Sequence, residues 1–176
     1  MPDVPVATTS DREVAPSVAA LNRLALGEAR GVFTSCCASE RWATAMEGGS
    51  PYTTPEAVLD HAEAAFDALA REDWLQAFAA HARIGAPRAD DRRGAAEQAG
   101  AATASADELA ALRGLNDRYE ARFGHVFLIS ASGLEARQML AALRERLANP
   151  PARELEIVAA QQREITRLRL RALLAS

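Results

Sequence analysis

Helix-starting residues followed by apolar stripes at helical spacing limit what this chain can fold into. Thr54-Pro55-Glu56 combines a threonine N-cap, a proline whose missing N–H is harmless in the first turn, and an acid near the positive end of the helix dipole. Apolar residues then recur at intervals of three and four, which predicts one buried helical stripe formed by Val58, Leu59, Ala62, Ala65, Phe66 and Leu69.

The next segment shows the same pattern and carries a histidine near its end. Asp73 is expected to cap a second helix that ends near Gly85-Ala86-Pro87, and this places His81 in a last helical turn. The apolar face of this helix holds Trp74, Leu75, Phe78 and Ala82.

The second half of the chain also reads as helices. Ser105 to Glu108 has the spacing of a capping box and opens a helix that stops at Gly124. Residues 134–147 and 152–174 are strongly helical and are separated by Asn149-Pro150-Pro151.

One short apolar run, 125–130, has the composition of a strand but no evident partner strand, so we expect an extended connection between helices. The prediction is an all-α fold: a single-domain bundle of about seven or eight helices over 17–176, preceded by a flexible tail over 1–16.

Composition and charge exclude several classes of protein. A chain of 176 residues that is 49% hydrophobic fits one domain with a sizeable core. The formal net charge is −4 and the arginines are scattered among acids, so the basic stripe of a nucleic-acid binder is missing. The first fifteen residues contain no apolar signal-peptide core, and no later segment is long and apolar enough to span a membrane.

The two cysteines, Cys36 and Cys37, are neighbours, and neighbouring cysteines seldom meet disulfide geometry. This favours a reducing compartment, so we expect a cytoplasmic protein. The C-terminus lacks the Ser-Lys-Leu peroxisomal address.

The chain contains no lysine, which excludes a Schiff-base mechanism and an internal pyridoxal aldimine. A metal site is also poorly supported, because His61, His81 and His125 are far apart and no His-x-x-x-His or Cys-x-x-Cys spacing is present. We therefore expect neither a metal nor an organic cofactor.

A series of short motifs in order resembles one enzyme family, the 2-oxo-4-hydroxy-4-carboxy-5-ureidoimidazoline (OHCU) decarboxylases, which act in the oxidative route from urate to allantoin. The likeness covers about 150 residues. It begins near Leu21-Asn22 and runs through Cys37-Ala38-Ser39-Glu40-Arg41-Trp42, His81-Ala82-Arg83-Ile84-Gly85, Glu97-Gln98-Ala99-Gly100, Leu115-Asn116-Asp117-Arg118-Tyr119, the segment 122–133, and Ile165-Thr166-Arg167-Leu168-Arg169-Leu170.

The resemblance implies a cofactor-free carboxy-lyase that converts OHCU into S-allantoin and CO2. In this substrate the departing carboxylate lies next to a C=N bond, so the substrate is its own electron sink. An enzyme then needs to orient the carboxylate, move protons and stabilise an enediamine. His81 matches the catalytic histidine of the family, and a neutral histidine suits this proton exchange.

The other expected site residues follow from the same motifs. Glu97 matches the acidic partner, which would orient the imidazole or the ureido nitrogens, and Gln98 offers an amide to the ureide. The segment 127–131 corresponds to backbone groups that bind substrate, and Arg169 to a late arginine that faces an anion. The expected set is His81 and Glu97 as catalytic residues, with Ala82, Gly94, Gln98, Phe127, Leu128, Ile129, Ser130, Ala131 and Arg169 as substrate-binding residues.

Two of these positions depart from the family pattern. Ala82 replaces a proline, and Gly94 stands where a serine hydroxyl usually contributes a hydrogen bond. They suggest one alternative, a relative that acts on a different ureide. The other alternative is a non-catalytic helical interaction module, in which His81 would be a capping or core histidine.

The resemblance also implies partners. Members are commonly homodimers, and urate oxidase and 5-hydroxyisourate hydrolase precede them in the pathway. Nucleic acid and membrane are not expected partners.

Overall fold

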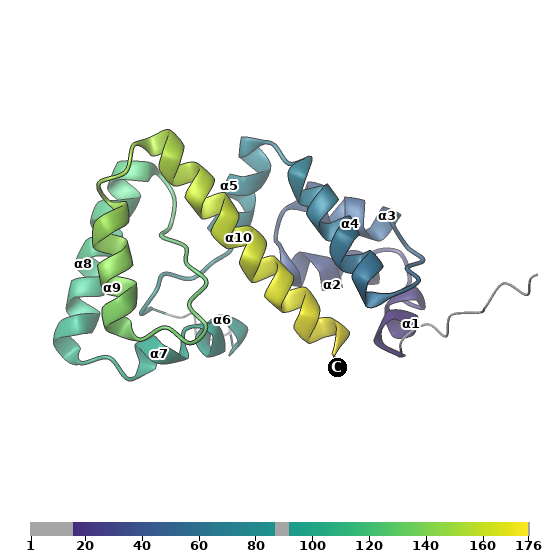
Figure 1. Cartoon of the computed structure of the whole chain (residues 1–176), viewed down its shortest axis with the longest axis horizontal. Helices are drawn as coiled ribbons and strands as arrows, with labels where there is room; N and C mark the ends of the chain where they lie inside the picture. Colours follow the sequence, from purple (N-terminus) through teal and green to yellow (C-terminus); the bar gives the residue numbers. More distant parts are fainter. Residues whose placement is uncertain (1–15, 87–91, 176) are drawn as a thin grey trace, which may run out of the picture.

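The computed structural model describes residues 16–86 and 92–175, and this part of the chain contains ten helices and no β-strand (Figure 1). The helices are α1 (Pro16–Asn22), α2 (Glu28–Cys36), α3 (Glu40–Gly48), α4 (Pro55–Asp67), α5 (Arg71–Ala79), α6 (Arg92–Glu97), α7 (Ala99–Ala102), α8 (Ala106–Phe123), α9 (Ala136–Arg146) and α10 (Pro151–Leu174).

The all-α prediction is therefore confirmed, while the expected count of seven or eight helices is too low. The helices α1, α6 and α7 have 7, 6 and 4 residues. A helix of one or two turns is too short to show an apolar stripe, so periodicity cannot detect it. Pro16 already belongs to α1, and the rest of the expected N-terminal tail, residues 1–15, lies outside the described residues.

The helix boundaries predicted at Thr54, Ser105 and Gly124 are confirmed. The Thr54 side chain accepts a hydrogen bond from the backbone N–H of Ala57 and begins α4. Ser105 and Glu108 form the reciprocal capping box that begins α8. Gly124 ends α8 in the left-handed region, with φ 76°, a conformation that favours glycine.

The predicted boundaries of α5 are wrong at both ends. The helix begins at Arg71 after the N-cap residue Ala70, and Asp73 lies in its first turn, where its carboxylate accepts from the backbone N–H of Ala70 at 2.9 Å. It ends at Ala79, so His81 lies just beyond the helix rather than in its last turn. The residues that follow form a tight turn closed by Arg83 and Ala86, which removes Ala82 and Ile84 from the helix and buries them.

The helices enclose two apolar clusters, and α10 runs diagonally across the molecule between them (Figure 1). The first core is formed mainly by α1 to α5 with α10 and includes Phe33, Trp42, Phe78, Val158 and Leu170. The second core is formed mainly by α8, α9 and the segment between them and includes Leu112, Tyr119, Phe127, Met139 and Leu143.

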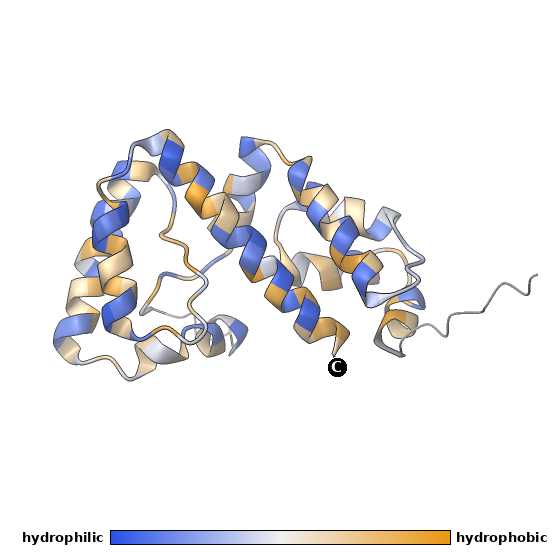
Figure 2. Ribbon diagram, in the orientation of Figure 1, coloured by the Kyte–Doolittle hydropathy of each residue, from blue (hydrophilic) through white to orange (hydrophobic). Residues whose placement is uncertain are grey.

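The segment 125–131 connects α8 to α9 as an extended stretch without strand pairing, as the sequence predicted. It is the largely hydrophobic loop that runs between α9 and α10 in Figure 2. Side chains from α9 and α10 fix it: Arg146 donates to the Leu128 carbonyl at 2.7 Å, and Gln161 accepts from the Ser130 N–H at 2.8 Å. Two polar anchors thus set the path of a segment that has no ladder of its own.

Neither cysteine is in a disulfide, and both side chains are buried. Among the helices that the structure describes, none combines the length and apolar character needed to cross a membrane.

Candidate active site

Four segments of the chain enclose a cavity of about 450 Å³. They are the turn after α5, the helix α6 with Gln98, the segment 128–132, and the second half of α10. The volume falls in the range of small-molecule sites. Its lining residues are His81, Ala82, Ile84, Arg93, Ala96, Glu97, Gln98, Leu128, Ile129, Ser130, Ala131, Ser132, Ile165, Leu168, Arg169, Ala172 and Leu173.

Most of the residues expected from the sequence meet in this cavity, although they are spread over nearly ninety positions of the chain. Those that line it are His81, Ala82, Glu97, Gln98, Leu128, Ile129, Ser130, Ala131 and Arg169. Gly94 is buried in α6 and is not among the lining residues. Phe127 is 1% exposed and packs in the second core, where its ring centroid lies 5.3 Å from that of Tyr119.

His81 reaches the cavity from the turn that follows α5. Its backbone N–H donates to the Phe78 carbonyl at 3.0 Å, which fixes the start of the turn. Its ring atom Nε2 lies 2.9 Å from Oε1 of Gln162 on α10. The imidazole is therefore half-buried and held by hydrogen bonding rather than free in solvent.

Glu97 and Arg169 form a two-pronged ion pair on the cavity wall. Arg169 donates from Nε and Nη2 to the two carboxylate oxygens of Glu97, both at 2.7 Å. Its Nη1 lies 3.4 Å from the Cys36 carbonyl. This fork geometry fixes both planes, so the cavity presents an arginine whose charge is partly neutralised by its own partner.

Gln98 ties α6 to the turn that carries His81. Its Oε1 accepts from the backbone N–H of Gly85 at 3.0 Å, and the side chain is buried. Gly85 has φ 78°, a left-handed conformation that favours glycine. The amide expected to face a ureide therefore has its oxygen engaged in holding the turn.

The backbone of 128–131 is partly committed to the fold. The Leu128 carbonyl accepts from Arg146, and the Ser130 N–H donates to Gln161. The Ala131 carbonyl accepts from the Leu134 N–H. Among the described residues, neither backbone group of Ile129 nor the N–H of Ala131 has a hydrogen-bond partner in the chain. These residues line the cavity, so their open backbone groups can bind a ligand.

The two cysteines are buried, and the Cys36 carbonyl lies next to Arg169. Burial raises the pKa of both the Cys36 and the Cys37 thiol, so neither is activated as a thiolate. Both thiols therefore belong to the core rather than to the reacting groups of the cavity. No group of three or more His, Cys, Asp or Glu side chains within 16–86 and 92–175 could hold a metal ion.

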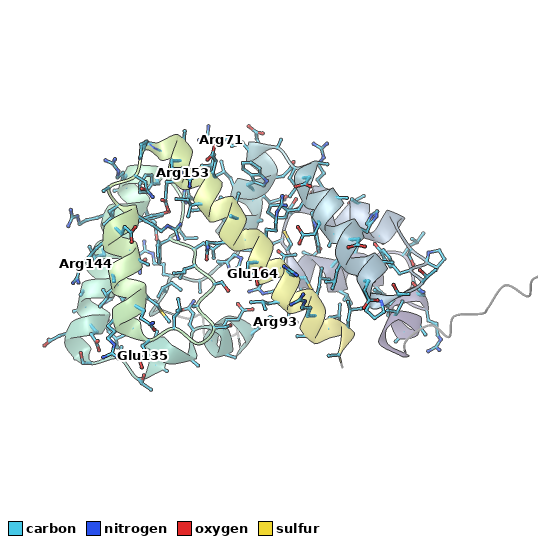
Figure 3. The ribbon with its side chains drawn as sticks, in the orientation of Figure 1. Arg71, Arg93, Glu135, Arg144, Arg153 and Glu164 are labelled. Atoms are coloured by element: carbon cyan, nitrogen blue, oxygen red, sulfur yellow. The ribbon has the colours of Figure 1, made fainter. Side chains whose placement is uncertain are left out.

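The sequence reasoning missed several lining residues on α10 and α6. Ile165, Leu168, Ala172 and Leu173 supply apolar wall, while Arg93 reaches across from α6 to the Ser35 carbonyl at 2.8 Å (labelled in Figure 3). A usable signal existed for α10. Once Arg169 is placed at the site, helical spacing puts Ile165 and Ala172 on the same face, with Gln162 one turn further.

The site therefore combines apolar walls with an imidazole, an ion pair and open backbone groups. Such a cavity can orient a small ligand with several donors and acceptors, and the imidazole can exchange a proton with it.

Comparison with known proteins agrees with this chemistry. Residues 22–171 match the family model of OHCU decarboxylase. The chain is 41% identical over 142 residues to the uric acid degradation bifunctional protein TTL of Arabidopsis thaliana, a match that covers 77% of this chain and 44% of the plant protein. It is 36% identical over 80 residues to the 2-oxo-4-hydroxy-4-carboxy-5-ureidoimidazoline decarboxylase of Amia calva, covering 46% of each. The chain thus spans less than half the length of these two relatives.

Among solved structures, the fold is similar to a crystal structure of OHCU decarboxylase in the presence of (S)-allantoin. The TM-score is 0.74 at 35% identity, and the match covers 82% of this chain and 97% of that one.

Proposed function

Because this chain belongs to the OHCU decarboxylase family, we propose that it decarboxylates 2-oxo-4-hydroxy-4-carboxy-5-ureidoimidazoline to S-allantoin and CO2. One observation carries the proposal: side chains and backbone from four distant segments, each part of a family-like motif, converge on one cavity. A scaffold that had lost catalysis would have no reason to keep His81, Glu97 and Arg169 around a common space.

The chemistry asks little of the protein beyond orientation and proton transfer. Breaking the bond to the carboxylate releases CO2 and leaves an electron pair on the ring carbon. This pair forms a double bond to the carbon of the adjacent C=N group, and the electrons of that C=N bond move to its nitrogen, which takes up a proton. The hydroxyl loses its proton as the carbonyl forms, and the carbon that bears the ureido group is protonated to give allantoin. Every electron stays in the substrate, so no external sink is required.

The cavity residues suit these steps. His81 exchanges a proton with the hydroxyl or with the developing carbanion. Arg169, held by Glu97, contributes partial positive charge to an anionic ligand. The open backbone groups of Ile129 and Ala131 bind the ureide, which offers both donors and acceptors, and the apolar wall from α10 excludes water.

The setting is proposed on the same basis. The family resemblance supports a homodimer, with urate oxidase and 5-hydroxyisourate hydrolase supplying the substrate. Two free, buried cysteines support a reducing, cytoplasmic location.

A coupled reaction tests the proposal. Urate oxidase and 5-hydroxyisourate hydrolase generate OHCU, the protein is added, and circular dichroism follows the allantoin formed. OHCU also decays without enzyme, and a proton can then reach either face of the planar intermediate. We expect an excess of S-allantoin and faster decay, unchanged after dialysis against a chelator.

The matched variant is His81→Asn, which keeps a polar side chain but cannot act as a base. We expect it to lower turnover by about 10² to 10⁴-fold with an unchanged far-ultraviolet spectrum. Racemic allantoin at the spontaneous rate from the folded wild-type protein would overturn the proposal and favour the helical interaction module. Turnover of another ureide in place of OHCU would favour the relative with a changed substrate.

A further inference from the structure

Gln162 is a fully buried amide that contacts the imidazole of His81 from outside the cavity. It lies near the middle of α10 with 0% exposure and is not a lining residue of the cavity. Its Oε1 is 2.9 Å from Nε2 of His81, and its Nε2 donates to Oγ1 of Thr166 at 3.2 Å. Gln162 therefore acts on the site through His81.

Thr166 decides which way the amide points. Its hydroxyl donates to the backbone carbonyl of Gln162, one helical turn earlier, at 2.8 Å. A threonine hydroxyl carries one proton, so towards the Gln162 side chain it can act as an acceptor. The group that faces Thr166 must then be the amide NH2, and the amide oxygen must face His81.

The reversed amide is worse at Thr166. Its oxygen would face the Thr166 hydroxyl, whose proton is already donated to the Gln162 backbone carbonyl, and two acceptors would meet inside the core. An unsatisfied buried polar group costs about 1 to 3 kcal/mol, so the observed orientation is strongly preferred.

We propose that Gln162 is a positioning residue that holds neutral His81 as the Nε2–H tautomer, which leaves the lone pair on Nδ1. The amide oxygen accepts from Nε2–H, and Nδ1 is the basic atom of the ring. The inference rests on the proposed function for its catalytic meaning: an imidazole held in one tautomer and one orientation exchanges protons with the ligand, while Gln162, which does not line the cavity, acts only through His81.

Nuclear magnetic resonance tests the tautomer without any activity measurement. The full-length protein is labelled with 15N and long-range 1H–15N spectra are recorded at a pH where the imidazoles are neutral. His81 is assigned by the signals missing from His81→Asn. We expect the Nε2–H pattern for His81, and an Nδ1–H pattern in the wild-type protein would overturn the inference.

Two substitutions separate positioning from packing. Gln162→Met keeps the volume but removes the acceptor, so we expect a mixture of tautomers, kcat lowered by at least about 10-fold, and KM changed little. Gln162→Glu restores an acceptor and should restore the Nε2–H pattern. Gln76→Met, a matched change at an exposed glutamine of α5, should leave both readouts unchanged.

The outcomes distinguish the two proposals. A pure Nε2–H tautomer in a protein that forms no allantoin would retain the positioning role and reject the proposed function. Full activity and an unchanged tautomer in a folded Gln162→Met variant would reject the positioning role while the function stands. A Gln162→Met variant that unfolds leaves the wild-type spectrum and Gln162→Glu as the deciding measurements.

Discussion

Glu97 and Arg169 show how single residues set the charge of the cavity. Their side chains are 25% and 14% exposed, so the pair is partly shielded from water and from salt. Each is the other's geometric support, because both carboxylate oxygens and two guanidinium nitrogens are used. Removing either partner takes away the two-pronged contact that fixes the plane of the other.

We therefore predict strong coupling between Glu97→Gln and Arg169→Met. Each single change should lower kcat/KM, and the double variant should be no worse than the worse single one, since the second change removes a residue that is already displaced. Coupled kinetics on the four proteins of the cycle measure this. Losses that simply multiply would show that the two residues act separately.

At this scale the sequence predicted residues inside continuous motifs and missed a residue outside them. His81, Glu97 and Arg169 belong to motifs with a recognisable order. Gln162 lies in a polar run of α10, Gln161-Gln162-Arg163-Glu164, that reads as a solvated face. Its burial depends on the turn after α5 packing against α10, a tertiary contact that no local pattern encodes.

At the scale of elements, a buried charged network joins α8, α9 and α10 behind the segment 125–131. Arg146 donates to Glu154 at 2.7 Å and to the Leu128 carbonyl, and Asn149 donates to the same carboxylate at 2.7 Å. The Tyr119 hydroxyl also donates to Glu154, and burial together with this contact raises the pKa of the tyrosine well above its usual range. The network thereby anchors one wall of the cavity from inside the core.

We predict that Arg146→Met destabilises the protein by about 3 to 5 kcal/mol, because it leaves the fully buried Glu154 without its charge partner. Arg153→Met is the matched control. The side chains of Arg153 and its partner Glu156 are 65% and 66% exposed. The free energy of unfolding should therefore fall by less than about 1 kcal/mol. Arg153 lies at the start of α10 in Figure 3. Urea unfolding compares the two, and equal losses would contradict the network's importance.

Helix boundaries were predictable where one residue fixes them, by its side chain or by its backbone conformation. Thr54, Ser105 and Gly124 carry their own capping chemistry, and α4 and α8 begin or end beside them as expected. The start of α5 was missed because Ala70 has no capping side chain, and its end because Ala80 and Ala82 favour helix locally. What ends α5 is the turn that brings His81 to Gln162, a contact between distant segments.

At the scale of the whole molecule, His125 lies where the two cores meet. Its ring packs against Phe78 of the first core at 5.6 Å and against Tyr119 and Phe123 of the second at 5.7 and 6.1 Å. Burial lowers the pKa of His125 below its ordinary value of 6.5. The junction between the cores therefore favours a neutral imidazole.

This gives a pH dependence of stability with a definite sign. Below pH 6.5 the unfolded chain binds a proton at His125 before the folded one does, so the free energy of unfolding falls as the pH drops through this window. Well above pH 6.5 both states are neutral and the contribution is constant. Urea unfolding from about pH 7.5 to about pH 5, a range that spans the ordinary histidine pKa, should show a shallower fall for His125→Phe than for wild type. Identical slopes would contradict the assignment.

Helix α10 contributes both to the first core and to the cavity wall, and this limits how the protein can be redesigned. Changes at Ile165 or Arg169 would alter ligand preference and folding together, because the same helix carries Val158 and Leu170 into the first core. Exposed lining positions elsewhere are not so constrained. A search for variants with new ureide selectivity should therefore randomise Arg93, Ala96 and Ser132 first.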